Sequence, residues 1–250
     1  MKTDKAWQLW GDKEPYYAVV TEEKYLAENL GEHGVEEFFE RGRKHLDQTF
    51  ALLRTHVDAT FAPTRALDFG CGTGRVLVPL AECCETVFGV DVSEGMLREA
   101  ASNCSARVQP QNWRLVTTQE LLTDRGIRYD FLHSHIVFQH IRRKEGERLL
   151  LLLLERLEPG GAIALQFMRR NTAPLARRCV TWLKNRLPFA QRASRLLTGK
   201  RHLVAPMEMN AYNIDRIKNI LAEARVSNLY LSTSESGVVH SVTIYGRKAS

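Results

Sequence analysis

The sequence predicts an α/β fold with a doubly wound sheet of seven strands, mostly parallel, in which the last strand is antiparallel. Three observations predict it. An apolar segment, 66–69, runs into a glycine-rich turn and then into apolar residues at helical spacing. Strand-like and helix-like segments then alternate up to residue 167, as parallel sheets require. Two strand-like segments, about 229–233 and 239–247, close the chain and favour a final antiparallel pair.

The glycine turn spans residues 70–74, where glycine occupies every second position. Glycine adopts the positive φ of a tight turn and lets a ligand approach the backbone closely. The dinucleotide fingerprint G-x-G-x-x-G would place its third glycine where this chain has Arg75. The spacing therefore disfavours a NAD-dependent reductase.

Two acids flank this turn. Asp68 lies at the end of the preceding strand, and Asp91 lies at the end of the next strand-like segment, 86–92. A carboxylate at the second position can accept hydrogen bonds from both ribose hydroxyls of a nucleoside. With the segment 89–96, these residues resemble the class I S-adenosylmethionine-dependent methyltransferases. The resemblance covers about residues 63–248 apart from a basic stretch, and it implies a Rossmann-like fold with S-adenosylmethionine as cofactor.

The resemblance places the cofactor contacts at the strand ends. It implies that Asp68 orients the glycine loop and the methionine amino group, and that Asp91 holds the ribose. The family commonly has an acid after the third strand that contacts adenine. Here Thr118 or Gln119 stands instead. The residues expected to bind the cofactor are Asp68, Gly70, Cys71, Gly72, Gly74, Asp91, Val92, Met96, Thr118 and Ser134.

Histidines follow the fourth strand-like segment, 129–134. The carboxyl end of this strand lies beside the switch point at which doubly wound sheets bind ligands. His135 and His140 are candidate catalytic bases because an imidazole titrates near neutral pH, and the family often has a histidine at the second position. Alternatively, His140 braces the loop, since methyl transfer mainly needs in-line positioning. No residue pattern suggests a catalytic metal.

Residues 1–62 are expected to form an aromatic and helical cap on a methyltransferase core of residues 63–250. A helix is expected over about 35–61. The aromatic side chains of the first 25 positions either pin this segment to the core or fold over the cofactor as a lid. A lid would exclude water and attract the sulfonium by cation–π interaction. In that case Trp10, Tyr16 and Tyr17 contact the substrate.

The stretch 169–206 carries ten Lys and Arg residues and no Asp or Glu, in a chain of net charge +6. It is expected to form a helical insertion after the fifth strand, 162–167. One alternative is a solvated basic face. Another is an acceptor site in which Arg169 and Arg170 bind phosphate or carboxylate groups. A third is peripheral contact with anionic lipid. RNA ranks lower because no nucleic-acid-binding module accompanies the stretch.

The length of 250 residues suits one α/β domain with additions. Five cysteines without metal or disulfide spacing, and no apolar leader or span, indicate a cytoplasmic protein that is peripheral to the membrane if the basic stretch binds lipid. The expected function is methyl transfer to an oxygen or nitrogen of a small-molecule or glycan-like acceptor. That acceptor is anionic or lipid-linked if the basic stretch takes part.

Two alternative functions stay open. An RNA or protein methyltransferase is disfavoured because the N-P-P-Y type of signature is absent after the fourth strand, where Ser-His-Ile-Val stands. A cofactor-binding regulatory protein without turnover would keep the same glycines and acids.

Overall fold

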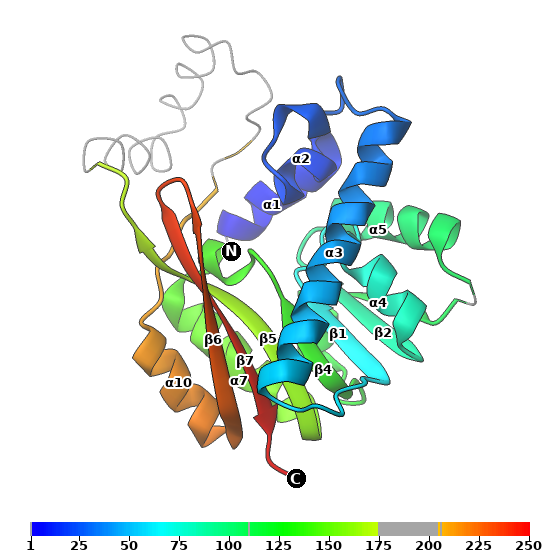
Figure 1. The fold of residues 1–250 in the computed structure, drawn as a ribbon. Helices are drawn as coiled ribbons and strands as arrows, with labels where there is room; N and C mark the ends of the chain where they lie inside the picture. The colour runs from blue at the N-terminus through cyan, green and yellow to red at the C-terminus, as the bar shows by residue number, and fades with distance from the viewer. Residues whose placement is uncertain (1, 110, 175–204, 206) are drawn as a thin grey trace.

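The computed structural model describes residues 2–109, 111–174, 205 and 207–250, which form one mixed sheet covered by helices (Figure 1). Its seven strands are β1 (Arg65–Phe69), β2 (Thr86–Asp91), β3 (Trp113–Thr117), β4 (Tyr129–Ser134), β5 (Leu157–Asn171), β6 (Val226–Ser236) and β7 (Val239–Lys248). The strand order is β3-β2-β1-β4-β5-β7-β6. Pairing is parallel from β3 to β5, and β7 runs antiparallel to both β5 and β6. The predicted fold class is confirmed, including the antiparallel last strand.

The described helices are distributed along the whole chain. They are α1 (Lys2–Lys13), α2 (Pro15–Val19), η1 (Glu23–Tyr25), α3 (Glu32–His56), α4 (Leu77–Cys83), α5 (Glu94–Arg107), α6 (Thr118–Thr123), η2 (Phe138–His140), α7 (Arg143–Arg156) and α10 (Ile214–Glu223). No helix within the described ranges combines the length and the apolar character needed to cross a bilayer.

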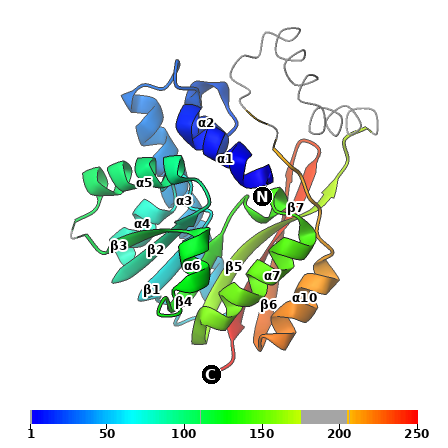
Figure 2. The same ribbon diagram turned by 180° about the vertical axis from the view of Figure 1, so that it is seen from behind.

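Two hydrophobic clusters cover opposite faces of the sheet. Successive strand residues point to opposite faces, so Phe131 of β4 packs with α3 and α4, whereas Leu132 packs with α7 and α10. The same alternation separates Ala162 from Ile163 on β5. Figure 1 shows α3 in front of the sheet, and Figure 2 shows α6 and α7 in front of the other face. Burial on both faces fits the apolar parallel strands.

Three predicted elements differ in extent from the observed ones. The predicted helix 35–61 is α3, which begins at Glu32 and ends at His56. The fifth strand is longer than expected and runs to Asn171, because the end of β5 pairs with the start of β7. Arg169 and Arg170 therefore belong to β5 rather than to a helix. The rest of the predicted basic insertion, at 175–204 and 206, lies outside the described residues.

Helix α1 docks on the start of α5 at a pair of glycines. A Cβ on Gly11 would collide with Ser93 Oγ and lie 2.8 Å from the backbone nitrogen of Met96. A Cβ on Gly95 would lie 2.7 Å from the carbonyl carbon of Gly11. Only glycine allows this approach of the two backbones. Figures 1 and 2 show α1 and α2 lying over one end of the sheet as a result.

Candidate active site

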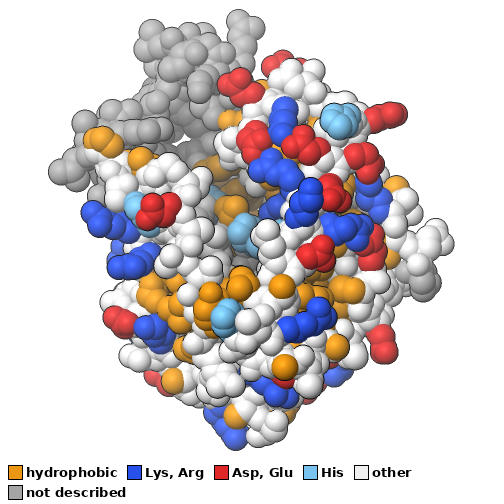
Figure 3. Space-filling model, in the orientation of Figure 1, with side chains coloured by type: hydrophobic (Ala, Val, Ile, Leu, Met, Phe, Trp, Pro, Cys, Tyr) orange, Lys and Arg blue, Asp and Glu red, His pale blue; other side chains and the backbone are white. Residues whose placement is uncertain are grey.

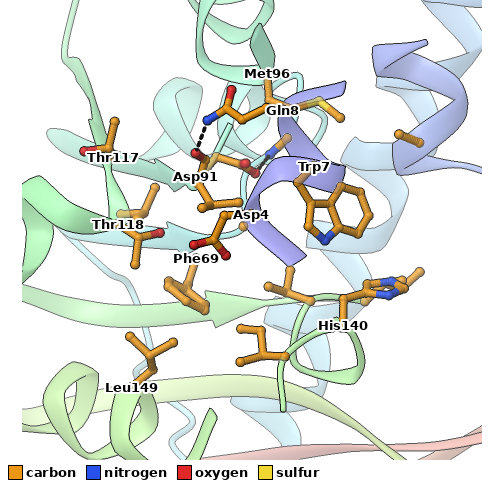
Figure 4. A pocket seen from close by; sticks show the side chains of 18 of the residues that line it. Asp4, Trp7, Gln8, Phe69, Asp91, Met96, Thr117, Thr118, His140 and Leu149 are labelled. Atoms are coloured by element: carbon orange, nitrogen blue, oxygen red, sulfur yellow. Dashed lines mark hydrogen bonds between the residues drawn. The ribbon is translucent and has the colours of Figure 1, made fainter. Parts of the chain in front are cut away.

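A cavity of about 600 Å³ lies at the carboxyl ends of β1 to β4. This volume falls within the range of small-molecule sites, and the position is the one that doubly wound sheets use for ligands. Figure 4 shows Asp91, Thr117 and Thr118 on one side of the cavity, with Trp7 and His140 opposite them. The lining residues discussed below come from three parts of the fold. They are Asp4, Trp7 and Gln8 of α1, Gly70, Gly72, Asp91, Val92 and Met96 at the strand ends and turns, and Thr118, Gln119, His135 and His140 after β3 and β4.

The glycine turn adopts the conformation that its sequence predicts. Gly70, Gly72 and Gly74 have φ values of 78°, 54° and 90°, in the left-handed region that favours glycine. A Cβ on Gly70 would collide with the Val137 side chain. The backbone N–H of Gly70 donates to the Val90 carbonyl at 2.7 Å, which fixes the turn against β2. The turn therefore presents bare backbone to the cavity.

Asp91 is held by backbone donors at the end of β2. Its carboxylate accepts hydrogen bonds from the N–H of Gly72 at 3.0 Å and of Ser93 at 2.9 Å. Burial raises the pKa of Asp91 from 3.8 to about 6, and these N–H groups oppose that effect. Ser93 in turn caps α5, as its side chain accepts from the Met96 N–H. The carboxylate is thus fixed beside the glycine turn, as a ribose-binding group must be.

Helix α1 forms one wall of the cavity, but with other side chains than the Trp10, Tyr16 and Tyr17 expected from the sequence. Asp4, Trp7 and Gln8 line the cavity. The Gln8 amide donates to the Val92 carbonyl at 2.8 Å (Figure 4). The Gln8 carbonyl oxygen accepts from the Glu94 N–H at 3.2 Å. These contacts place α1 directly beside Asp91. The aromatic crowding of the first 25 residues pointed to this segment but could not show which side chains face inward.

The aromatic residues named for the lid lie behind the cavity wall. Trp10 is 1% exposed and packs on Tyr17, with ring centroids 6.0 Å apart. The Tyr16 hydroxyl lies 3.0 Å from Glu99 Oε1 and from Asn103 Oδ1, and burial raises the Tyr16 pKa to about 12. These side chains attach the segment to α5, and Trp7 is the aromatic residue of α1 that reaches the cavity.

Both ring nitrogens of His140 already have partners. His140 Nδ1 lies 2.8 Å from the Glu208 carbonyl oxygen, and Nε2 lies 3.2 Å from the Gln139 side-chain nitrogen. The ring also packs edge-on against Trp7 at 5.0 Å. Burial lowers the pKa of His140 to about 4. This geometry suits a histidine that braces the loop and α1.

His135 lines the cavity next to a strained residue. Ile136 has φ 62°, an uncommon conformation for a β-branched side chain, and its N–H donates to Gln166 Oε1 at 3.0 Å. The sharp turn leads from β4 into residues 135–137, which line the cavity. Burial, with the neighbouring Arg75 guanidinium, lowers the pKa of His135 well below 6.5. The imidazole is therefore neutral at physiological pH and keeps a lone pair.

Other predicted site residues lie outside the cavity wall. Ser134 is buried, and its hydroxyl donates to the Phe69 carbonyl at 2.9 Å. The Asp68 carboxylate accepts from His133 rather than from the glycine turn. Arg169 and Arg170 are exposed on β5 and do not line the cavity. Cys71 and Gly74 belong to the glycine turn but do not border the cavity.

Residues 66–161 match the family described as a methyltransferase domain. The match begins in β1, includes the glycine turn, Asp91 and the histidines after β4, and ends within β5. Residues 66–161 are therefore a methyltransferase domain of the class I S-adenosylmethionine-dependent type. The family resemblance of the sequence motifs is thereby confirmed. Within the described residues no group of three or more His, Cys, Asp or Glu side chains is placed to hold a metal ion.

Curated relatives of this methyltransferase include ubiquinone biosynthesis O-methyltransferases. The one from Rhizobium leguminosarum bv. trifolii (strain WSM2304) is 31% identical over 107 residues, which are 43% of this chain and 41% of that protein. The one from Caulobacter sp. (strain K31) is 30% identical over 112 residues, 45% of this chain and 44% of that protein. The chain spans about two fifths of the length of the curated relatives it matches.

Solved structures of methyltransferases share the fold over nearly the whole chain. Magnesium protoporphyrin IX methyltransferase from Synechocystis PCC 6803 with bound S-adenosylmethionine covers 100% of this chain and 98% of that chain, with a TM-score of 0.62 and 17% identity. The N-methyltransferase NodS from Bradyrhizobium japonicum WM9, in complex with S-adenosyl-L-homocysteine, covers 95% and 100%, with a TM-score of 0.54 and 14% identity.

Proposed function

We propose that this protein transfers the methyl group of S-adenosylmethionine to an oxygen or nitrogen of a small-molecule or glycan-like acceptor. One observation carries the proposal: the glycine turn and Asp91 face the same cavity as His135. A nucleoside-holding carboxylate and a neutral imidazole thus border one space of about 600 Å³. The names of the relatives, which are O- and N-methyltransferases, support this acceptor chemistry.

The residues around the donor side fit the cofactor. Asp91 accepts hydrogen bonds from the ribose hydroxyls, and its backbone donors keep the carboxylate in place for them. The bare backbone at Gly70 and Gly72 lets the cofactor lie along the turn. Thr118 and Gln119 border the cavity where an adenine edge can be bound. When bound, the cofactor supplies an electrophilic methyl group on a sulfonium.

The remaining residues orient the acceptor and exclude water. Trp7 covers the cavity from α1 and offers an aromatic face near the sulfonium. His135 faces the acceptor, while His140 braces Trp7 and the segment around Glu208. Transfer depends mainly on the in-line position of the nucleophile. A role for Arg169 and Arg170 with an anionic acceptor, and membrane contact through 169–206, stay predictions.

Calorimetry followed by a labelled-methyl screen tests the proposal. We expect stoichiometric binding of S-adenosylmethionine and S-adenosylhomocysteine, and label transfer to a phenol, an alcohol or an amine within a panel of small acceptors. The panel includes an RNA pool and a protein extract as arms for the alternative acceptors. Cofactor binding without transfer to any small acceptor would overturn the proposal and favour a regulatory protein. Transfer only to the RNA or protein arm would also overturn it.

A further inference from the structure

Three side chains from three separate elements form a hydrogen-bonded chain beside the cavity. Asp68 on β1 and His133 on β4 are register partners in adjacent parallel strands. His133 Nδ1 lies 2.7 Å from Asp68 Oδ1, and both side chains are buried. On its other side, His133 Nε2 lies 3.0 Å from Nε2 of His45, which belongs to α3. The chain therefore runs from the buried sheet to the helix that packs across it.

The order of hydrogen-bond donors in this chain follows from its buried end. As a carboxylate, Asp68 can only accept, so His133 must donate through Nδ1–H. The neutral His133 ring then has its lone pair on Nε2, and His45 must donate through its own Nε2–H. This leaves the lone pair of His45 on Nδ1. Asp68 thus fixes the tautomer of two imidazoles in succession, as carboxylates do for histidines in other sites.

His45, the outer end of this hydrogen-bonded chain, does not itself border the cavity but packs on a residue that does. The His45 ring packs on the cavity-lining His135, with centroids 4.1 Å apart. His45 is partly exposed, and its Nδ1 has no hydrogen-bond partner within the described parts of the chain. Figure 3 shows that the face carrying α3 is hollowed near its centre, with hydrophobic and histidine side chains around the hollow.

Burial and the neighbouring groups keep the resting His45 ring neutral. Burial lowers the pKa of His45 to about 2, and the charges of His133 and Arg75 act in the same direction. A positive charge is therefore disfavoured at His45, and the two hydrogen bonds of His133 connect His45 to the Asp68 carboxylate.

We propose that His45, His133 and Asp68 form a relay in which His45 Nδ1 accepts the proton of the acceptor nucleophile during methyl transfer. This inference rests on the proposed function. The acceptor oxygen or nitrogen forms a bond to the methyl carbon, and the carbon–sulfur bond breaks with its electron pair kept by sulfur. The proton of the nucleophile passes to His45 Nδ1, and the His45 Nε2 proton passes to His133 Nε2. The imidazolium of His133 is then paired with Asp68.

The relay defines the chemical class of acceptor. A lone pair on His45 Nδ1 binds a group that carries a proton, such as a hydroxyl or a protonated nitrogen. A carboxylate acceptor has no proton to donate and gains nothing from the relay. We therefore expect methyl transfer to a neutral hydroxyl or an N–H group rather than to a carboxylate oxygen.

The tautomers are tested without turnover by nitrogen-15 NMR of the histidine rings in the full chain. We expect His45 to be a neutral Nε2–H tautomer, and His133 to show a downfield Nδ1–H proton from its bond to Asp68. Both signals should change in Asp68→Asn, which removes the charged acceptor. The His45 signal should also change in His133→Phe, which interrupts the row of hydrogen bonds. If one variant fails to fold, the other decides the question. A His45 ring that carries its proton on Nδ1 in the unaltered protein would overturn the relay.

Kinetics then test the role of His45 with a matched control on the same helix. His45→Phe keeps a ring against His135, and we expect kcat for a hydroxyl acceptor to fall about 100-fold. Binding of S-adenosylhomocysteine should stay within about twofold of the unaltered protein. The control is His56→Phe, because His56 of α3 stacks on Tyr230, at 3.8 Å between ring centroids, away from the cavity.

The two measurements separate the relay from the proposed function. Undiminished turnover in His45→Phe, or an equal loss for a hydroxyl and a carboxylate acceptor, would overturn the relay while the methyltransferase activity stands. If the protein transfers no methyl group to any acceptor, the proposed function fails, and the catalytic part of this inference fails with it. The NMR result then still decides the order of donors and acceptors.

Discussion

The cavity has two sides that are built in different ways. The donor side, with Gly70, Gly72 and Asp91, comes from residues that lie within one short length of chain at the ends of β1 and β2. On the proposed acceptor side, His135 after β4 and Trp7 of α1 line the cavity, and His45 of α3 packs on His135 from outside the lining. Backbone geometry dominates the first side, and side-chain contacts between distant segments dominate the second.

This difference shows which part of an α/β site has a local sequence signature. A glycine turn that must adopt positive φ beside a carboxylate leaves a fixed spacing in the sequence. A histidine on a packed helix leaves none, because helical spacing only tells which face is buried. The following predictions test whether the two sides are as separable as this comparison implies, from the largest expected effect to the smallest.

The largest effect is expected for Gly70→Ala on the donor side. The new Cβ would collide with Val137, and the residue would be forced to keep φ 78°. We expect a loss of about 2–3 kcal/mol in the free energy of unfolding and roughly 100-fold or more in affinity for S-adenosylhomocysteine. Urea unfolding and calorimetry measure both. The control is Gly237→Ala, at φ 57° with no atom within 4 Å, which should cost only about 1 kcal/mol and leave affinity unchanged.

Asp91→Ala should damage cofactor binding without unfolding the protein. Loss of the hydrogen bonds from the ribose hydroxyls to a charged acceptor should weaken S-adenosylhomocysteine binding roughly 100-fold. Calorimetry compares this variant with Asp12→Ala, which removes an exposed ion pair to Arg98 of 2.8 Å and should change stability by less than about 1 kcal/mol. Affinity equal to that of the unaltered protein would refute the ribose assignment.

Trp7→Ala tests the contribution of α1 to the cavity. Because Trp7 lines the cavity and packs on His140, we expect roughly tenfold weaker binding of S-adenosylhomocysteine with the fold intact. Leu9→Ala, a change at a 45% exposed position on the same helix, is the control and should have little effect. Fluorescence or calorimetric titration measures the difference. Equal affinity in the two variants would show that α1 is only a structural attachment.

The pH dependence of binding is expected to be no larger than the effect of Trp7→Ala. Since the Asp91 pKa is raised to about 6, the carboxyl gains a proton as the pH falls from 7 to 5 and accepts ribose hydrogen bonds less well. We expect roughly tenfold weaker S-adenosylhomocysteine binding at pH 5, and no such dependence in Asp91→Asn. An affinity of the unaltered protein that is flat over this range would contradict the raised pKa.

For the stability of the free protein, the sign of the Asp91 effect is reversed. The folded state binds a proton more tightly than the unfolded state, because the folded pKa of about 6 exceeds the ordinary value of 3.8. The contribution of Asp91 to stability therefore falls as the pH rises through the interval between these two values. Thermal unfolding of the unaltered protein and Asp91→Asn across this interval should show the difference.

Much of the fold could be predicted from the sequence, because most strands are short apolar segments that can be recognised without knowing their partners. β4 has the predicted boundaries, and the predicted strand 86–92 agrees with β2 to within one residue. The extension of β5 to Asn171 could not be predicted, since it depends on pairing with β7 about 70 residues later in the chain. Its sequence, with two adjacent arginines, suits an exposed edge or a helix equally well before that partner is known.

The site was predictable to the same extent and for the same reason. Gly70, Gly72 and Asp91 line the cavity, as their motif indicated. Trp10 lies one turn after Trp7 on a neighbouring part of the same side of α1, but it is 1% exposed and packs on Tyr17 instead of lining the cavity. The partner of Asp68 could not be foreseen, because His133 reaches it only through the parallel register of β1 and β4.

The contact between Gly11 and Gly95 has a consequence for how the protein would exchange its cofactor. Helix α1 cannot slide along α5, because their backbones touch, and the Gln8 side chain fastens it to Val92 and Glu94 next to Asp91. Any movement of α1 away from Asp91 would therefore break both Gln8 hydrogen bonds and separate the Gly11–Gly95 contact.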